Sequence, residues 1–310
     1  MKYIKLFEEF LNEEKSTPLK KIAIAVGIDF IDNRYIYKKD WDTYKVFELL
    51  TKNDKSEPLD LPLLNYGRVK TENLIKAGYD KNLIYNPIEA KKRVSSKSEW
   101  YKLHDGSKHI IKTVYSGKDL KDLKFPIIAK PDNNFSGQGI TVFKNESELK
   151  GKDLSKFGVF SEMIDIKDEI RIFCWMGKPI MHVYRIPANE ETKKLTKDPD
   201  DKLKFIYELD TKKLDSKFDE LIKEFSDEHK DLHFYSIDVA VDANDKMYVI
   251  EMSSEPGPAY GVLELVYREM YLTHFKKPLS AEESEQLDKH REHDIQQTMD
   301  AEPERFKIRK

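Results

Sequence analysis

Two acidic side chains, Asp238 and Glu251, are placed where they could hold a metal ion. They lie in two strand-like segments: 234–241 alternates apolar and polar residues, and 247–252 is rich in β-forming residues. If a two-residue loop at 244–245 joins these segments, Asp238 lies directly opposite Glu251. Directly opposed Cβ atoms are about 4.5–5.5 Å apart, and like charges there are destabilising. Such a pair either splays into water or holds a cation, and hard oxygen ligands favour Mg²⁺ or Mn²⁺.

The remaining residues of this hairpin divide into a polar and an apolar face. Ser236 is expected opposite Ser253, on the same face as the two carboxylates. The other face is apolar and comprises Ile237, Val239, Ile250 and Met252. The pattern predicts a hairpin that covers a core and presents its acidic face to a cleft. An ordinary amphipathic hairpin has the same alternation, so other segments must decide between the two readings.

A glycine-containing loop follows Lys130, which ends a predicted strand. The loop carries Ser136, Gly137, Gln138 and Gly139. Glycines let backbone N–H groups approach an anion, and a lysine can neutralise a phosphate. The loop is not a P-loop, because the Gly-Lys-Ser/Thr ending is absent and a strand follows instead of a helix. A strand–loop–strand unit of this kind can close as a flap over phosphates, although a plain hairpin loop has a similar composition.

A second segment carries residues suited to a nucleoside. Glu162, Met163 and Ile164 leave a predicted strand, where backbone groups could bond the edge of an adenine and apolar side chains could cover its ring. Glu169, a few residues later, could accept the ribose hydroxyls.

Two arginines could serve the transferred phosphate or a substrate carboxylate. By the period of two, Arg171 shares a strand face with Glu169 and Phe173, and Arg185 lies in a later strand. A guanidinium matches the geometry of both phosphate and carboxylate groups. The plainer alternative is a surface ion pair between Glu169 and Arg171.

These motifs follow one another in a definite order. A strand-ending lysine precedes Ser-Gly-Gln-Gly, Phe-Ser-Glu-Met-Ile, Glu-Ile-Arg-Ile-Phe, a later arginine, an aspartate within a strand, and Glu-Met-Ser-Ser-Glu-Pro-Gly. This order, over residues 85–265, resembles the ATP-grasp superfamily, nearest to ribosomal-protein glutamate ligases and glutathione synthetase-like enzymes. The resemblance implies an α/β (α+β) ATP-grasp fold, with two α+β lobes that hold the nucleotide and a small α/β domain before them.

The resemblance also implies roles for individual residues. On the phosphate side, Lys130 matches the family's phosphate-binding lysine, residues 136–139 match the flap, and Lys97 matches an earlier lysine that follows a turn, here at 86–87. On the nucleoside side, the matches are Glu162, Met163 and Ile164 for the adenine linker and Glu169 for the ribose-binding acid. The implied metal ligands are Asp238, Glu251 and Ser253.

Three features depart from the family pattern and concern the acceptor chemistry. Ser253 stands where the family usually has asparagine; its hydroxyl can still ligate Mg²⁺, directly or through water. Glu255 stands before Pro-Gly where a small residue is common, so it could add charge to the metal site or face solvent. An Arg-x-Asn pair that the glutamate ligases carry is missing from 186–233.

The function implied by the resemblance is that of an ATP-dependent carboxylate–amine (or thiol) ligase, ADP-forming, which works through an acyl phosphate. Its expected cofactors are ATP and Mg²⁺ (or Mn²⁺), and its substrates small-molecule or peptide carboxylates and amines. Arg171 or Arg185 would support the acyl phosphate or orient the carboxylate. Two alternatives stay open: an ATP-grasp phosphotransferase, and a nucleotide-binding adaptor with weak or no turnover.

Composition limits the other possibilities. A chain of 310 residues with 39% hydrophobic content can bury a sizeable core and form more than one domain. The net charge of −3 gives no electrostatic case for nucleic acid or an anionic membrane surface, and no apolar run approaches the length of a membrane span. The single cysteine, Cys174, excludes an intramolecular disulfide and is expected to be a small buried hydrophobe. We therefore expect a cytoplasmic protein, and the oligomeric state is not predicted.

The elements that must position these residues are expected to form four parts. Alternating strands and helices between 17 and 90 favour a small α/β domain. The expected parts are an N-terminal amphipathic segment (1–16), the small α/β domain (17–90), an ATP-grasp domain (91–275, with lobes 91–160 and 161–275) and a charged C-terminal tail (276–310). From residue 280 on, the charged sequence is typical of a solvated helix or a tail.

Overall fold

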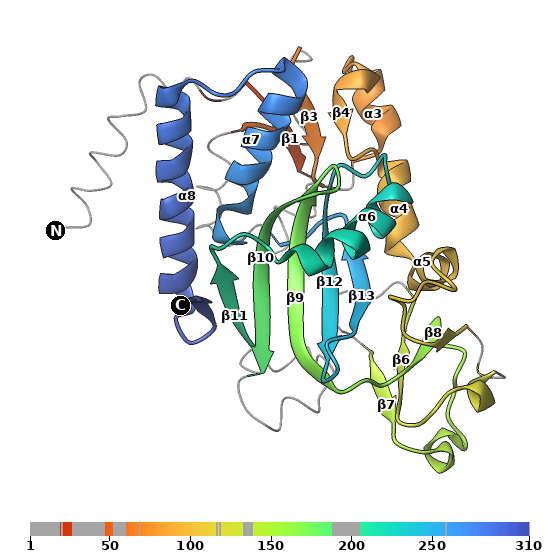
Figure 1. The fold of residues 1–310 in the computed structure, drawn as a ribbon. Helices are drawn as coiled ribbons and strands as arrows, with labels where there is room; N and C mark the ends of the chain where they lie inside the picture. The colour runs from red at the N-terminus through yellow and green to blue at the C-terminus, as the bar shows by residue number, and fades with distance from the viewer. Residues whose placement is uncertain are drawn as a thin grey trace.

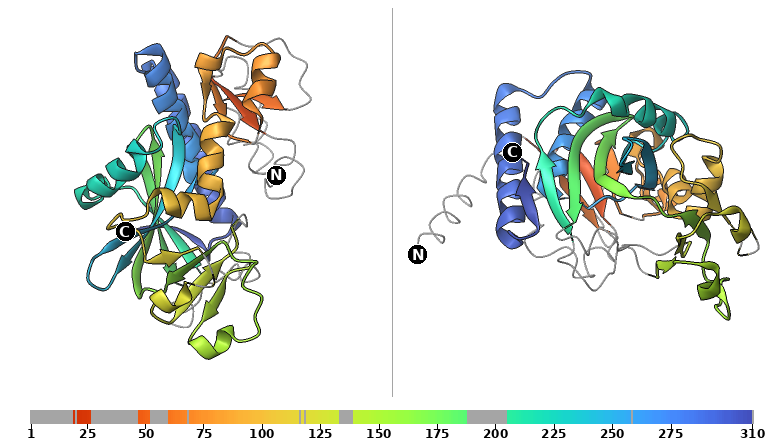
Figure 2. Two further views of the ribbon diagram at one scale, coloured as in Figure 1. Left: turned by 90° about the vertical axis from the view of Figure 1, so that its right-hand side faces the viewer. Right: turned by 60° about the horizontal axis from the view of Figure 1, so that its bottom comes forward.

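Three β-sheets organise the part of the chain that the structure describes. The computed structural model describes residues 19, 21–26, 47–51, 60–67, 69–115, 117, 119–132, 139–187, 205–257 and 259–309. Figures 1 and 2 show a six-stranded central sheet with a smaller four-stranded sheet at each end. No helix within these ranges is long and apolar enough to cross a membrane.

The first small sheet, the N-terminal sheet, is parallel and has the order β2-β1-β3-β4. Its strands are β1 (Ala23–Val26), β2 (Glu48–Thr51), β3 (Leu63–Asn65) and β4 (Ile84–Tyr85), with helix α3 (Thr71–Lys76) and the short η3 (Lys81–Leu83) between β3 and β4. Within the continuous apolar run 22–26, residues 22–25 are buried and β1 lies between two neighbouring strands, as the composition predicts for a parallel sheet. The predicted amphipathic segment 1–16 lies outside the described residues.

The second small sheet, the middle sheet, is antiparallel and has the order β5-β8-β6-β7. Its strands are β5 (Thr113–Val114), β6 (Ile127–Lys130), β7 (Thr141–Phe143) and β8 (Val159–Glu162), with short helical turns η4 (Leu120–Asp122) and η5 (Glu146–Leu149). Helices α4 (Ile88–Ser95) and α5 (Lys97–Leu103) precede it and run beside the central sheet (Figure 1). The sheet therefore carries Lys130 at the end of β6.

The central sheet has the order β13-β12-β9-β10-β11-β14. Its strands are β9 (Ile166–Trp175), β10 (Lys178–Pro187), β11 (Phe205–Asp210), β12 (Phe234–Asp242), β13 (Met247–Ser253) and β14 (Phe306–Ile308). The helical elements around it are η7 (Ser216–Phe218), α6 (Asp219–Asp227), η8 (Ala259–Gly261), α7 (Val262–Phe275) and α8 (Ala281–Ala301). All neighbouring strands are antiparallel except β14, which runs parallel to β11.

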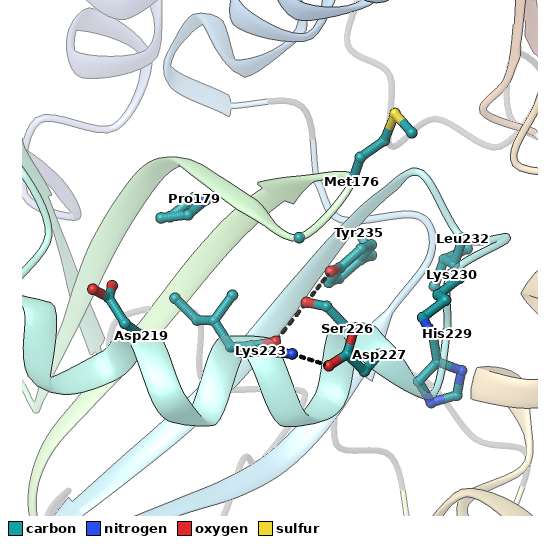
Figure 3. Close-up of a pocket in the computed structure, with 12 residues that line it drawn as sticks. Met176, Pro179, Asp219, Lys223, Ser226, Asp227, His229, Lys230, Leu232 and Tyr235 are labelled. Atoms are coloured by element: carbon teal, nitrogen blue, oxygen red, sulfur yellow. Dashed lines mark hydrogen bonds and ion pairs between the residues drawn. The ribbon is translucent and has the colours of Figure 1, made fainter.

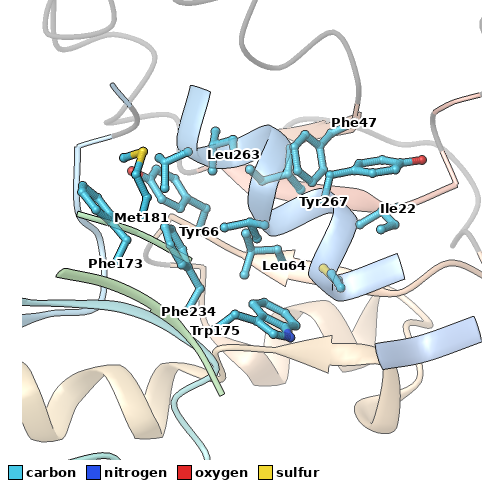
Figure 4. Close-up of a cluster of buried hydrophobic side chains, with 14 of the residues drawn as sticks. Ile22, Phe47, Leu64, Tyr66, Phe173, Trp175, Met181, Phe234, Leu263 and Tyr267 are labelled. Atoms are coloured by element: carbon cyan, nitrogen blue, oxygen red, sulfur yellow. The ribbon is translucent and has the colours of Figure 1, made fainter. Parts of the chain in front are cut away.

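Two hydrophobic cores cover opposite faces of the central sheet. On one face, residues such as Ile172 and Val239 pack with Phe225 of α6, and Cys174 is buried there as predicted. On the other face, Phe173 packs with side chains of α7 and of the N-terminal sheet, and Figure 4 shows this second core. The period of two along β9 separates the faces, so the charged residues that alternate with the first core point to the same side as Phe173.

The predicted pairing of the carboxylates is confirmed, although the predicted turn is wrong. Asp238 pairs with Glu251, and Ser236 with Ser253. The connection spans residues 243–245 instead of two residues, and Asp245 takes a left-handed conformation with φ of 59°. By itself, this longer turn would shift the register by one residue from the predicted one.

A β-bulge at Ile250 restores the register before the carboxylates are reached. Val239 pairs with Val249 while Asp238 pairs with Glu251, so Ile250 is the extra residue on β13. The predicted apolar face is therefore corrected at one position: Val249, not Ile250, lies in the core with Met252.

The C-terminal part of the chain is not a tail. The predicted tail 276–310 contains α8, which begins at a Ser280 capping box, and β14, which adds an edge strand to the central sheet. Composition misled the prediction because α8 is charged over most of its surface, while only Leu287, Glu283 and Asp294 are buried along it. The division of the remaining chain into domains stays a prediction.

Candidate active site

The two predicted metal carboxylates lie beside an arginine in one row across three strands. Asp238 on β12 pairs with Glu251 on β13 and with Arg171 on β9. Arg171 donates two hydrogen bonds to Asp238, Nε to Oδ1 and Nη2 to Oδ2, each 2.7 Å long. Burial lowers the pKa of Arg171, but the charge of Asp238 and these hydrogen bonds outweigh burial and raise it. The cation therefore offsets part of the repulsion between the two carboxylates.

A second ion pair lies one row along the same face. Glu169 pairs in register with Arg185 on β10, and Arg185 Nη1 donates to Glu169 Oε1 over 2.5 Å. Both side chains are largely buried, with 9% of the Arg185 side chain and 13% of the Glu169 side chain exposed. The alternative prediction, a pair between Glu169 and Arg171, is wrong, because each arginine bonds the carboxylate directly across the sheet from it.

We call β13, which carries the predicted ligands Glu251 and Ser253, the metal strand. Lys130 is connected to this strand through one tyrosine. Its Nζ donates to Tyr101 Oη over 3.2 Å and lies 5.5 Å from the centroid of the Tyr101 ring. Tyr101 Oη in turn donates to the carbonyl of Ile250 over 2.9 Å. The bulged residue thus supplies the carbonyl that joins the middle sheet to the hairpin. This link, which sequence reasoning missed, brings the predicted phosphate lysine and metal carboxylates into one region.

The start of the predicted flap is tied to the beginning of α5. Asp132 accepts hydrogen bonds from Ser98 N–H at 2.7 Å and from Ser96 Oγ at 3.0 Å, and Lys97 N–H donates to the Asp132 carbonyl over 3.3 Å. Burial raises the pKa of Asp132, but these hydrogen bonds and the charge of Lys97 lower it overall. The structure therefore places Lys97 next to the flap.

Within the flap itself, only its last predicted residue is described. Gly139 is exposed and has φ of 72°, a conformation that glycine adopts at no steric cost. Ser136, Gly137 and Gln138 lie outside the described residues.

Gly158 is a further residue that sequence reasoning missed. Its N–H donates to the Lys130 carbonyl over 3.0 Å. A Cβ at this position would lie 2.7 Å from Asp132 Cβ and 3.0 Å from Asp132 Cα. Only glycine therefore lets the residue that precedes β8 pack against Asp132, which follows β6 at the start of the predicted flap.

The predicted adenine linker is partly engaged within the middle sheet. Glu162 N–H donates to the Lys112 carbonyl and Met163 N–H to the Pro126 carbonyl, at 3.0 and 2.9 Å. The Glu162 carboxylate accepts from Lys124 N–H over 3.0 Å. The expectation of free backbone groups is thus corrected for these two N–H groups. Ile164 follows them in a half-buried position outside regular structure.

The residues proposed for the metal suit a magnesium ion that is shared with phosphates. In the described part of the chain, no group of three or more His, Cys, Asp or Glu side chains could hold a metal ion by itself. Mg²⁺ in nucleotide sites commonly uses one or two carboxylates and keeps water and phosphate oxygens as its other ligands. Asp238, Glu251 and the Ser253 hydroxyl fit this donor set. Ser253 Oγ accepts from Glu255 N–H over 3.3 Å, which orients the hydroxyl.

Glu255 takes neither of the places expected for it. Its carboxylate lies 2.7 Å from Lys91 Nζ, and only 2% of the Lys91 side chain is exposed. Lys91 also donates to the carbonyls of Asn65, Tyr66 and Gly67, at 3.2, 2.9 and 2.6 Å. A buried lysine of α4 therefore joins the N-terminal sheet to the end of the metal strand. No pattern in the sequence distinguishes it from its neighbour Lys92.

Comparison with known proteins identifies the family. Residues 80–255 match the family described as "ATP-grasp domain, R2K clade family 3", which is more than half of the chain. The chain belongs to this ATP-grasp family. The predicted ATP-grasp fold is thereby confirmed. No curated protein matches the chain.

Solved structures show the same ATP-grasp fold at low sequence identity. D-alanine–D-alanine ligase from Bacillus anthracis, complexed with ATP, has a TM-score of 0.53 and 16% identity, over 91% of this chain and 98% of that one. A RiPP-associated ATP-grasp ligase from Chryseobacterium gregarium, in complex with ADP and a leader and core peptide, has a TM-score of 0.52 and 17% identity. This match covers 83% of this chain and 98% of that one. N5-carboxyaminoimidazole synthetase from Staphylococcus aureus, complexed with ADP, has a TM-score of 0.52 and 14% identity. This match covers 78% of this chain and 72% of that one.

A cavity of about 480 Å³ lies elsewhere in this ATP-grasp chain. Figure 3 shows that its lining comes from α6 and the residues that follow it, from Tyr235 of β12, and from the turn between β9 and β10. Its floor includes Tyr235, whose hydroxyl is hydrogen-bonded to Ser226 Oγ over 2.6 Å. None of the predicted site residues lines it. The candidate active site is therefore defined by the converging charged side chains, and not by this cavity.

Proposed function

We propose that the protein is an ATP-dependent carboxylate–amine (or thiol) ligase that forms an acyl phosphate. One observation carries the proposal: two carboxylates pair across a hairpin, and the bulge in the second strand of that hairpin is bonded, through Tyr101, to the buried Lys130. Cations and carboxylates that converge from two sheets suit a metal-bound polyphosphate. The ATP-grasp family of the chain supports the same assignment.

Each group has a role that follows from its charge and position. Lys130 would bind the nucleotide phosphates, and Asp238, Glu251 and Ser253 would hold Mg²⁺. The bound ion would supply charge neutralisation at the transferred phosphoryl group. Glu169 would accept the ribose hydroxyls, next to residues 162–164 at the adenine.

The proposed reaction has two balanced steps. A substrate carboxylate oxygen attacks the γ-phosphorus of ATP, the bond to the β–γ bridging oxygen breaks, and an acyl phosphate and ADP form. An amine then attacks the acyl carbon, phosphate leaves, and the amine loses a proton. An acyl phosphate hydrolyses readily in water, so the predicted flap 132–139 would serve to exclude water.

The two arginines would act in different ways. Arg171 is committed to Asp238 through two hydrogen bonds, so we propose that it fixes the metal carboxylate while its outer edge faces the phosphoryl group. Arg185 is bonded to Glu169, so it would link the ribose-binding acid to the substrate carboxylate.

The acceptor is the least determined part of the proposal. One solved structure with this fold, the Chryseobacterium gregarium ligase, is in complex with a leader and core peptide, and another is named for D-alanine. Peptides and amino acids are therefore the first acceptor classes to test.

Release of ADP tests the proposed function. The protein is incubated with Mg-ATP and a panel of amino acids and peptides, singly and in pairs, and ADP and phosphate are measured. A ligase releases both products only when a carboxylate and an amine substrate are present together. Failure of every pair, with Mg-ATP still bound, would contradict the ligase assignment and favour an adaptor.

Variants of the same hairpin provide the matched control. Glu251→Gln should abolish product release, whereas Asp245→Asn, at the exposed turn, should not change it. Glu251 is a cleaner target than Asp238, because Asp238 also carries the two hydrogen bonds of Arg171.

The phosphotransferase alternative has less support. A phosphotransferase can carry the phosphoryl group on a histidine, but the candidates His182, His229 and His233 are already engaged. His182 lies 3.5 Å from Asp210, and His229 is bonded to His104 over 3.1 Å. His233 Nδ1 accepts from Asn86 N–H over 3.2 Å. A product that retains the phosphoryl group after a single acceptor is added would revive this alternative.

A further inference from the structure

The segment that follows the metal strand is fixed by residues of the C-terminal part of the chain. We call residues 254–257 and 259–261 the exit segment. It begins directly after Ser253 and ends at α7. The family match ends at residue 255, so α8 and β14, which contact this segment, lie beyond it. Figure 1 shows α8 beside α7, with β14 returning to the edge of the central sheet.

Tyr260 has a backbone conformation that needs support. Its φ is 62°, in the left-handed region that residues other than glycine rarely adopt. The side chain is 2% exposed, and its hydroxyl donates to the Tyr207 carbonyl over 2.9 Å. Its ring meets that of Phe306 on β14 edge to face, with centroids 5.4 Å apart. Buried contacts with β11 and β14 therefore hold the strained residue.

Gly261 is held still more closely by α8. A Cβ at this position would lie 2.5 Å from Arg291 Cγ and 3.1 Å from the Arg291 carbonyl oxygen. Gly261 N–H donates to Asp294 Oδ2, and Asp294 is 7% exposed. The Asp294 carboxylate thus bonds the N-cap residue of α7, at the end of that helix where its dipole favours an anion.

The opposite side of the exit segment is bonded to the N-terminal half of the chain. Glu255 pairs with Lys91, and Tyr66 Oη donates to the Pro256 carbonyl. Glu255 N–H also donates to Ser253 Oγ, so the course of the segment fixes the hydroxyl that would complete the metal site. Seven residues separate Gly261 from Ser253, so a displacement at Gly261 would act on Ser253 through the exit segment.

We propose that Asp294 is a positioning residue for the metal–nucleotide site: through Gly261 N–H it holds the exit segment so that Ser253 and Glu251 face the metal ion. The inference rests on the proposed metal site of the preceding section. It assigns α8, which the amino-acid composition suggests is a solvated helix, to the active-site architecture. Groups that orient metal ligands without touching the metal typically contribute about 10–100-fold in metal affinity.

The test measures how strongly Mn²⁺ increases the affinity for ADP. Binding of ADP to the full chain is measured by calorimetry with and without Mn²⁺, and unfolding by urea is followed in parallel. We call the ratio of the ADP affinities with and without Mn²⁺ the Mn²⁺-dependent gain. Asp294→Ala should reduce this gain about tenfold and leave metal-free ADP binding unchanged. Asp294→Asn should retain most of the gain, because its amide oxygen can still accept from Gly261 N–H.

Two further variants keep the proposal falsifiable. Asp300→Ala, an exposed carboxylate on the same helix, should behave as the unmodified protein. Should Asp294→Ala not fold, Tyr260→Phe decides, since it removes only the hydrogen bond to Tyr207 and should reduce the gain about threefold. A folded Asp294→Ala with the full gain, or an Asn variant no better than the Ala variant, would overturn the positioning role.

This outcome can be separated from failure of the proposed function. The assay needs no acceptor, so it gives a result even if no ligase substrate is found. If Glu251→Gln also keeps the full Mn²⁺-dependent gain, the metal site is wrong. If Glu251→Gln loses the gain and folded Asp294→Ala does not, only the role of Asp294 is wrong.

Discussion

Two buried lysines of this protein differ in what surrounds their charge. Lys91 is 1% exposed and is neutralised by Glu255 and by three backbone carbonyls. Lys130 is 7% exposed, and its ammonium group donates to the Tyr101 hydroxyl. Among the described residues, no carboxylate lies in ion-pair contact with Lys130. A buried charge is costly unless it is paired. The charge of Lys91 is therefore already compensated within the fold, whereas Lys130 is suited to bind an anion.

A buried carboxyl group gives a third case. Glu264 on α7 is 1% exposed, and neither of its carboxylate oxygens has a hydrogen-bond partner among the residues that the structure describes. Burial, reinforced by the nearby Asp294 carboxylate, raises the pKa of Glu264 to about 8. A buried ionisable group can thus be paired, neutralised by its own proton, or left to bind a ligand. Lys91 and Glu264 represent the first two outcomes, and we propose the third for Lys130.

Removal of the paired lysine should have the largest effect. Lys91→Met leaves Glu255 and three carbonyls without their cation, so the free energy of unfolding should fall by about 3–5 kcal/mol. Urea unfolding measures this change, with Lys92→Met, at the exposed neighbouring position of α4, as the control. Equal stability of the two variants would show that Lys91 is not a structural charge.

Removal of the lysine at the candidate site should affect binding instead of stability. Lys130→Met should weaken ADP binding about 10–100-fold, because a charge-assisted hydrogen bond to a phosphate contributes roughly 1.5–3 kcal/mol. Its unfolding midpoint in urea should stay close to that of the unmodified protein. Lys124→Met, an exposed lysine before β6, is the control. Unchanged ADP affinity in a folded Lys130→Met variant would show that Lys130 does not bind the nucleotide phosphates.

The buried carboxyl group should make stability depend on pH. Between its ordinary pKa of 4.5 and about 8, the unfolded chain releases the Glu264 proton while the folded chain keeps it. Stability therefore falls as the pH rises through this window. Glu264→Gln avoids this pH-dependent loss of stability and should be up to about 3 kcal/mol more stable than the unmodified protein at pH 7, with the difference absent near pH 4. Urea unfolding across the window measures it; a pH-independent difference would mean that Glu264 does not keep its proton.

The third metal position should have the smallest effect. Ser253→Asn restores the family's usual residue type, and an asparagine oxygen can also accept from Glu255 N–H, as the serine hydroxyl does. ADP affinity in the presence of Mg²⁺ should therefore rise or stay within about fivefold, equivalent to about 1 kcal/mol. Ser253→Ala should lower it. A large loss in a folded Ser253→Asn variant would contradict the metal role of this position.

The parts of the site that depend on strand periodicity were predictable. The alternation along β12 and β13 gave the correct pairing of Asp238 with Glu251, even though the turn was predicted with the wrong length. Two errors cancelled: the three-residue turn and the bulge at Ile250 shift the register in opposite directions. The hydrophobic pattern fixes which face is buried, so the pairing at the carboxylates tolerates a change in the turn.

The remaining parts depend on contacts between distant segments. Lys91 and Lys92 are adjacent and identical in type, and only the fold places one of them against Glu255, 164 residues later. The charged composition of α8 hides the contact of Asp294 with Gly261. Which carboxylate each arginine bonds likewise depends on the order β12-β9-β10 in the central sheet, which no local pattern specifies.

The most direct test of the account is the Mg²⁺ dependence of ADP binding in Glu251→Gln. The central claim is that the hairpin carboxylates and Lys130 serve one metal–nucleotide site. Calorimetry with and without Mg²⁺ should show that the unmodified protein binds ADP more tightly with the metal, and that Glu251→Gln loses this increase but keeps metal-free binding. The control Asp245→Asn should match the unmodified protein. An unchanged Mg²⁺-dependent increase in folded Glu251→Gln would contradict the claim.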